Sequence, residues 1–146
     1  MIRKLKKSEI DSVMSIWLAS NREAHAFIPA EYWECNYESV KNTILNADVF
    51  VSVENDQIRG FIGLVENYIE GLFVEKTARG KGIGSELIRH AKSIRENLEL
   101  DVYQENPKAV QFYSRHGFEI VEKTVDPATG HTECRMRWHA VDGILT

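Results

Sequence analysis

Three glycines occupy alternate positions in one short segment, Arg79-Gly80-Lys81-Gly82-Ile83-Gly84, between a predicted strand and a predicted helix. Because glycine has no Cβ, the N–H groups of such a loop can point at one centre, and the helix that follows adds the positive end of its dipole. Arg79 and Lys81 contribute charge, and Ser85 contributes a hydroxyl donor. This combination predicts a phosphate or pyrophosphate site, whereas a simple turn from strand to helix would need only one glycine.

The glycine spacing disfavours the two common nucleotide-binding loops. A Walker loop follows G-x-x-x-x-G-K-[ST], but Glu75 stands five residues before Gly80, and Gly82 follows Lys81. A dinucleotide fingerprint follows G-x-G-x-x-G, whereas the third glycine here is Gly84. Successive βαβ units are also missing from the predicted order of elements. ATP and NAD are therefore disfavoured as ligands.

The elements that must position this loop follow from apolar periodicity and turn residues. Strands are predicted at residues 2–6, 49–53, 58–65, 68–74, 98–103, 118–125 and 133–138, and helices at 8–20, 30–46, 82–97 and 107–116. Ser8 with Asp11 is predicted to cap the first helix, and residues 21–29 are predicted to form a loop. Three antiparallel strands precede the central helix, and a strand–helix–strand unit follows it, so the fold class is α+β on a mixed sheet.

Composition limits the class of protein. The 146 residues are 43% hydrophobic and 27% charged, and no linker divides them, so we expect one globular domain spanning residues 1–146. The net charge of −4 disfavours a nucleic-acid partner. Cys35 and Cys134 are expected to be free thiols, without metal-ligand spacing. No apolar run is long enough for a membrane span, and the basic start lacks the apolar segment of a signal peptide, so a cytoplasmic location is expected.

Two segments together resemble the GNAT superfamily of acyl-CoA-dependent N-acetyltransferases. Residues 79–84 match its [QR]-x-x-G-x-[GA] signature, and the segment from Asn106 to Phe118 is similar to its N-x-x-A-x-x-F-Y-x-x-x-G-F block. The strand at residues 69–74 looks like the family's fourth strand. The resemblance implies a single-domain, mostly antiparallel sheet of six to seven strands, flanked by about four helices. A finer likeness, in His25-Ala26-Phe27-Ile28 and Tyr32-Trp33, is to small bacterial members that acetylate protein lysines.

The resemblance also implies how a coenzyme would bind. Acetyl-CoA would be the donor substrate, and no metal would be needed. The residues expected to hold the pyrophosphate are Arg79, Gly80, Lys81, Gly82, Ile83, Gly84 and Ser85. The backbones of Leu72, Phe73 and Val74 would pair with the pantetheine arm like an added strand, and the Asn106 amide would bond to the same arm. Asn106 is equally suited to cap the helix that begins at Pro107.

Acetyl transfer from a thioester to an amine needs two proton transfers. A lysine amine has a pKa of about 10.4, so it must lose a proton before attack, and the departing thiolate gains one. The resemblance places Tyr113 beside the sulfur as the general acid. Glu70 is the proposed base, directly or through a water, because strand alternation predicts that it shares a face with Tyr68, Leu72 and Val74. A merely solvent-facing Glu70 is an equal alternative.

The acceptor is not encoded in any one motif. His25, Phe27, Tyr32 and Trp33 are predicted to line its site, with core packing as the alternative. The predicted function is N-acetyl transfer from acetyl-CoA to a primary amine by direct attack, with a protein lysine, a protein N-terminus, a polyamine, an amino acid and an antibiotic amine left open as acceptors. A non-catalytic acyl-CoA-binding regulatory domain is disfavoured by the intact loop and Tyr113. The sequence leaves open monomer or homodimer, and whether residues 140–146 pack on a partner or fray.

Overall fold

The computed structural model describes residues 1–140 and confirms the predicted order of elements. These residues form β1 (Ile2–Lys4), α1 (Ile10–Ala24), α2 (Ala30–Leu45), β2 (Asp48–Glu54), β3 (Gln57–Val65), β4 (Tyr68–Val74), α3 (Ile83–Ile94), β5 (Asn97–Tyr103), α4 (Pro107–Arg115), β6 (Glu119–Val125) and β7 (Thr132–His139). The question of packing or fraying at the C-terminal end concerns residues 141–146, which lie outside the described residues. No helix within the described range is long and apolar enough to cross a membrane.

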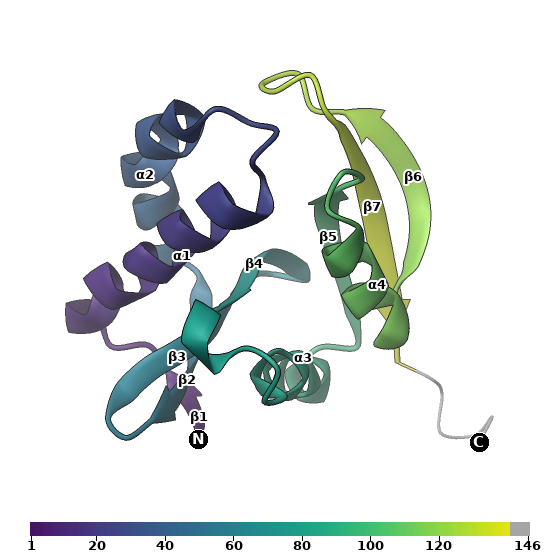
Figure 1. Ribbon diagram of the computed structural model, residues 1–146. Coiled ribbons are helices and arrows are strands. Elements are labelled where there is room, and N and C mark those ends of the chain that lie inside the picture. Colours follow the sequence, from purple (N-terminus) through teal and green to yellow (C-terminus); the bar gives the residue numbers. More distant parts are fainter. Residues whose placement is uncertain (141–146) are drawn as a thin grey trace.

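One seven-stranded sheet organises the molecule, in the order β1-β2-β3-β4-β5-β7-β6 (Figure 1). Every neighbouring pair is antiparallel except β4 and β5, which run parallel. These two strands pair at one point only, where Tyr68 stands opposite Glu99. The N–H of Glu99 also donates to the carbonyl of Asn67, at 2.9 Å. Beyond this point β4 and β5 are not bonded to each other, so the sheet is split between its two halves.

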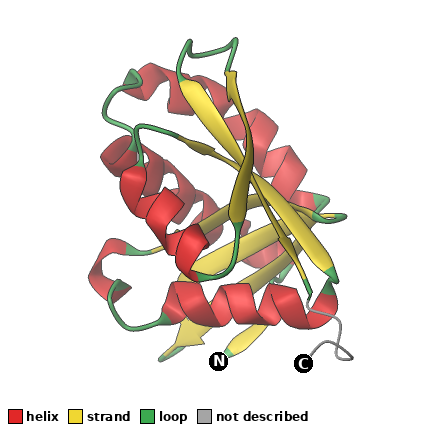
Figure 2. Cartoon of the chain, turned by 90° about the vertical axis from the view of Figure 1, so that its right-hand side faces the viewer, coloured by secondary structure: helices red, strands yellow, loops and turns green. Residues whose placement is uncertain are grey.

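Each face of the sheet has its own apolar core, because side chains alternate along the strands. Val49, Val51 and Phe61 pack with α1 and α2 on one face, whereas Ile62 and Leu64 pack with α3 and α4 on the other. In Figure 2 the twisted strands run between helices on both sides. Burying a side chain such as Leu64, which is fully inaccessible, stabilises the fold by about 2 kcal/mol.

The helix α3 illustrates how the local sequence determines an element. Its buried residues, Ile83, Leu87, Ile88 and Ala91, recur at helical spacing and form one apolar stripe. The helix ends at Ile94, earlier than predicted, because Arg95 is extended (φ −136°, ψ 143°) and its guanidinium donates to the carbonyl of Glu66.

The start of α1 differs from its predicted cap. A 3₁₀ turn over residues 7–9 precedes the helix, and the carboxylate of Glu9, not a Ser8–Asp11 pair, closes it by accepting from the N–H of Lys6 at 2.9 Å. The Glu9 carboxylate also pairs with Arg3 at 2.7 Å, and Arg3, then the N–H of Lys6, lowers its pKa to about 2. The predicted Ser8 cap is therefore wrong.

The loop predicted at residues 21–29 is shorter than expected, because α1 continues to Ala24. Asn21 is buried, and its amide donates to the carbonyl of Trp17 one turn back, at 2.9 Å. A polar residue that usually favours loops is thus accommodated inside the helix. As a result His25 is held at the end of α1 and not on a free loop.

Candidate active site

A cleft opens where β4 and β5 separate, at the carboxyl ends of these parallel strands. Its volume is about 880 Å³. The walls are the end of β4, the glycine loop, the first turn of α3, the start of α4 and the C-terminal end of α1. Among the lining residues are Leu72, Phe73, Val74, Arg79, Gly80, Gly82, Ile83, Gly84, Ser85 and Asn106, together with His25 and Tyr113. The structure therefore brings together nearly all the residues predicted to bind a coenzyme.

The glycine loop has the backbone that an anion site requires. Gly80 and Gly82 have φ values of +80° and +82°, which is the left-handed region that favours glycine. A Cβ at either position would meet no atom within 4 Å, so the space above the loop is open. The first hydrogen bond of α3 runs from the N–H of Glu86 to the carbonyl of Gly82, at 3.0 Å. The N–H groups of residues 83–85 consequently have no acceptor within the helix, and this donor set fits a pyrophosphate.

The other loop residues have different roles. Gly84 is small because of packing, since a Cβ there would lie 3.2 Å from the ring of Phe112. Arg79 donates to the carbonyl of Val74 at 3.1 Å and pairs with Glu23 of α1, so it ties the loop to both walls of the cleft. Lys81 is exposed and forms no ion pair within residues 1–140. Its ammonium is therefore available to a phosphate.

Asn106 forms hydrogen bonds in two directions. Its Oδ1 accepts the N–H of Ala109 at 3.3 Å, which confirms the helix cap. Its Nδ2 donates to Nε2 of His25 at 3.1 Å, from the opposite wall of the cleft. One N–H of the amide remains for a ligand in the cleft, so the cap leaves room for the predicted bond to a pantetheine arm.

The neutral form of His25 is required by its partners. Because Nε2 accepts from Asn106, the ring proton must be on Nδ1, which donates to Oδ1 of Asn21 at 3.0 Å. The side chain is 8% exposed, and burial lowers its pKa to about 4. A continuous series of hydrogen bonds thus runs from Asn106 through His25 and Asn21 to the carbonyl of Trp17, with each donor and acceptor assigned.

Tyr113 is buried on α4 and lines the cleft. Its ring packs edge-on against Phe112 and Phe118. Within residues 1–140 its hydroxyl forms no hydrogen bond, and burial raises its pKa well above the usual range. The hydroxyl is therefore protonated at neutral pH and free to donate.

Glu70 does not lie on the predicted face of β4. Leu64 of β3 pairs with Ile69 and Gly63 pairs with Gly71, so Glu70 is the extra residue of a β-bulge. The bulge reverses the alternation: Ile69 and Leu72 both pack on the α3 side. The prediction that Glu70 shares a face with Leu72 and Val74 is therefore wrong.

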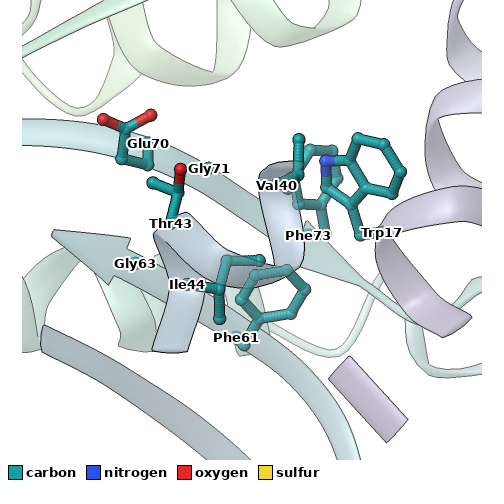
Figure 3. A pocket seen from close by; sticks show the side chains of 9 residues that line it. All are labelled: Trp17, Val40, Thr43, Ile44, Phe61, Gly63, Glu70, Gly71 and Phe73. Atoms are coloured by element: carbon teal, nitrogen blue, oxygen red, sulfur yellow. The ribbon is translucent and has the colours of Figure 1, made fainter. Parts of the chain in front are cut away.

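The bulge instead directs Glu70 toward α1 and α2. There it lines a pocket of about 100 Å³ with Gly71, Phe73 and residues of α1, α2 and β3. Figure 3 shows the Glu70 carboxylate and the Thr43 hydroxyl at one end of this pocket, and the ring of Trp17 at the other. Partial burial raises the pKa of Glu70.

The four residues predicted for the acceptor site gather at the corner between α1 and α2. His25 stacks on Trp33, with ring centroids 5.4 Å apart, and both are buried, so these two side chains pack the core. Phe27 and Tyr32 are only half-buried. The ring of Phe27 reaches the other half of the sheet, at 4.8 Å from His131. The corner therefore closes one end of the split in the sheet.

Several polar residues near this corner were missed by sequence reasoning. The hydroxyl of Tyr68 donates to Asp101 at 2.8 Å, and Arg135 also bonds to Asp101, at 2.7 Å. Tyr103 donates to Asp126 at 2.8 Å. These contacts join residues more than 20 positions apart: Arg135 stands opposite Asp101 in the β5–β7 register, Tyr68 comes from β4, and Asp126 lies in the turn between β6 and β7. Pairing of such distant residues has no local sequence signal.

Comparison with known proteins agrees with the geometry. The family model described as "Acetyltransferase (GNAT) domain" matches residues 46–120. The chain is 33% identical over 143 residues to the peptidyl-lysine N-acetyltransferase YiaC of Escherichia coli, covering 97% of this chain and 98% of YiaC. The solution structure of apo YjaB from Escherichia coli superposes with a TM-score of 0.84 at 28% identity, covering 97% and 98% of the two chains. The PaiA N-acetyltransferase of Thermoplasma acidophilum, in complex with coenzyme A, has the same fold, with a TM-score of 0.79 at 22% identity over 95% and 98%.

A sheet split between β4 and β5, with a glycine loop at the start of α3, defines an acyl-CoA-dependent acyltransferase, and the chain belongs to the GNAT family of acetyltransferases. It is an N-acetyltransferase that takes an acetyl group from acetyl-CoA and delivers it to a primary amine.

Proposed function

We propose that this enzyme acetylates the side-chain amine of lysine in proteins or peptides. The observation that carries the proposal is similarity over nearly the whole chain to a peptidyl-lysine N-acetyltransferase. A second such enzyme, YjaB of Escherichia coli, is 32% identical over 124 residues and covers 84% of each chain. The pocket on the α1–α2 side, which ends in a carboxylate, is chemically suited to an ammonium group.

Acetyl-CoA supplies the acetyl group as an activated thioester. The N–H groups of residues 83–85 and the ammonium of Lys81 would hold its pyrophosphate. The backbone of residues 72–74, beyond the last contact with β5, would pair with the pantetheine arm. The remaining N–H of Asn106 would donate to the same arm from the opposite wall.

The two candidate proton-transfer groups lie on opposite sides of β4. Tyr113 comes from the α4 side, where the coenzyme cleft lies, and Glu70 comes from the α1–α2 side. The amine nitrogen attacks the thioester carbon, so the C–N bond forms and the C–S bond breaks. Glu70 accepts the amine proton, directly or through one water, and Tyr113 donates its proton to the departing thiolate. A raised pKa of Glu70 makes this carboxylate a stronger base than an ordinary one.

A panel of acceptors tests the proposal by thiol release from acetyl-CoA. A lysine peptide with a blocked N-terminus should support turnover, whereas the same peptide with norleucine in place of lysine should not. A lysine-free peptide with a free N-terminus, a polyamine and an aminoglycoside represent the other acceptor classes. Faster turnover on any of these three than on the lysine peptide would refute the lysine assignment.

A further inference from the structure

Ser85 and His116 form a hydrogen bond at the edge of the coenzyme cleft. Ser85 is in the first turn of α3, and His116 is the residue that ends α4. Ser85 Oγ and His116 Nε2 are 2.9 Å apart, in a partly buried contact. The His116 ring also packs on Phe112, with centroids 4.7 Å apart, and Phe112 lines the cleft. The pair therefore stands beside the free N–H groups of the glycine loop.

The proton of this hydrogen bond can occupy either atom, and the two arrangements affect an anion in opposite ways. If Ser85 donates to Nε2, its oxygen presents only lone pairs to any other neighbour. If Nε2 carries the proton and donates to Oγ, the Ser85 O–H is released to donate elsewhere. Only the second arrangement favours a phosphate oxygen at the start of α3.

Basic side chains face His116 from both helices that pack against it. Arg89 and Lys92 are on α3, and Arg115 is on α4. Lys92 also donates to the main-chain carbonyl of His116. Burial, and then the charges of these three side chains, lowers the pKa of His116. An anion at the start of α3 would offset this repulsion and favour the protonated ring.

We propose that His116 is a positioning residue of the coenzyme site, which donates its Nε2–H to Ser85 and so directs the Ser85 hydroxyl proton to a pyrophosphate oxygen. A neutral ring with its one proton on Nε2 makes the same donation, but the charge of the bound anion favours the imidazolium, so binding of the coenzyme is linked to uptake of a proton from solvent by the ring. Affinity for the coenzyme is highest below the pKa of His116 in the free protein. It falls as the pH rises from that value to the higher pKa of His116 in the complex. This inference rests on the pyrophosphate-binding site of the proposed function and adds a histidine to that site.

Dephospho-CoA is the appropriate probe, because it keeps the pyrophosphate and lacks the 3′-phosphate, which itself titrates near pH ~6. Calorimetry at a series of pH values should show binding that weakens about tenfold, which corresponds to a pKa of His116 about one pH unit higher in the complex. Ring NMR of His116 with and without saturating dephospho-CoA measures the same change directly. His116→Gln keeps an N–H for Ser85 but cannot titrate, so its binding should lose this pH dependence.

Two serine variants separate the effect of the Ser85–His116 hydrogen bond on the pKa of His116 from simple attraction between the anion and the ring. Ser85→Ala should make the rise in the pKa of His116 smaller, whereas Ser93→Ala should keep the full rise, because the Ser93 hydroxyl is bonded to the carbonyl of His90 near the other end of α3. An unchanged His116 pKa on saturation, a full rise in Ser85→Ala, or a rise with CoA but not with dephospho-CoA would each overturn the inference. If the wild type bound neither CoA nor dephospho-CoA, the proposed pyrophosphate-binding site would itself be wrong, and the inference with it.

Discussion

Acidification should destabilise this protein through His25. The ring is buried at the end of α1, and both of its nitrogens are used in the neutral form: Nδ1 donates to Asn21, and Nε2 accepts from Asn106. A proton on Nε2 would place two donors face to face at 3.1 Å. Protonation therefore breaks the link between α1 and α4 across the coenzyme cleft.

The magnitude follows from the pKa of His25, which burial lowers from an ordinary 6.5 to about 4. Between these pH values the imidazole of His25 is protonated in the unfolded chain but neutral in the folded protein. The stabilisation is thus fully present above pH ~6.5 and is lost as the pH falls toward ~4. A difference of this size corresponds to about 3 kcal/mol in the free energy of unfolding.

Urea unfolding at pH 7 and at pH 4.5 measures this loss, and a matched variant isolates it from the other titrating groups. His25→Gln preserves an acceptor and a donor but does not titrate, so it should lose less stability than the wild type over the same range. His139→Gln, at an exposed position in β7, should behave like the wild type. If His25→Gln kept the full wild-type pH dependence, the assignment of a neutral, doubly bonded His25 would be wrong.

Three further predictions concern the proposed proton donor, the glycine loop and the proposed base. Tyr113→Phe should lower kcat by about 10²-fold or more with little change in coenzyme affinity, and an unchanged kcat would exclude Tyr113 as the proton donor. Gly82→Ala and Gly130→Ala replace glycines of similar left-handed φ (+82° and +76°). Each substitution should therefore lower the free energy of unfolding by about 1–2 kcal/mol. Only Gly82→Ala should also lose the rise in Tm that acetyl-CoA produces. Equal rises in the two variants would show that the glycine loop does not bind the coenzyme. Glu70→Gln should remove the acidic limb of the kcat/KM pH profile, whereas persistence of that limb would show that another group is the base.

The conformation of the glycine loop was predictable because it depends on residues close together in the sequence. The left-handed glycines, the apolar stripe of α3 and the cap at Asn106 each depend on residues within one or two turns of each other. The parallel β4–β5 pair follows from the strand–helix–strand order around α3. Short-range preferences therefore sufficed to place the loop between a strand and a helix, whereas the split of the sheet beside it was not predicted.

The placement of Glu70 could not be predicted from strand alternation. One extra residue in β4 reverses which side chains face α3. Opposed glycines, Gly63 and Gly71, are the signal that could have indicated the bulge, because glycine inside a strand often marks one. The bonds of His25 to Asn106 and of Ser85 to His116 join residues 81 and 31 positions apart. Such pairs depend on the packing of α1 and α3 against α4.

The transfer of a labelled acetyl group tests the central claim most directly. The enzyme would be incubated with isotope-labelled acetyl-CoA and a lysine peptide whose N-terminus is blocked, and fragment mass spectrometry would locate the label. We expect the label on the lysine side-chain nitrogen, formed faster with the wild type than with Tyr113→Phe. No label above the level formed without enzyme, or equal labelling by the two proteins, would contradict the account.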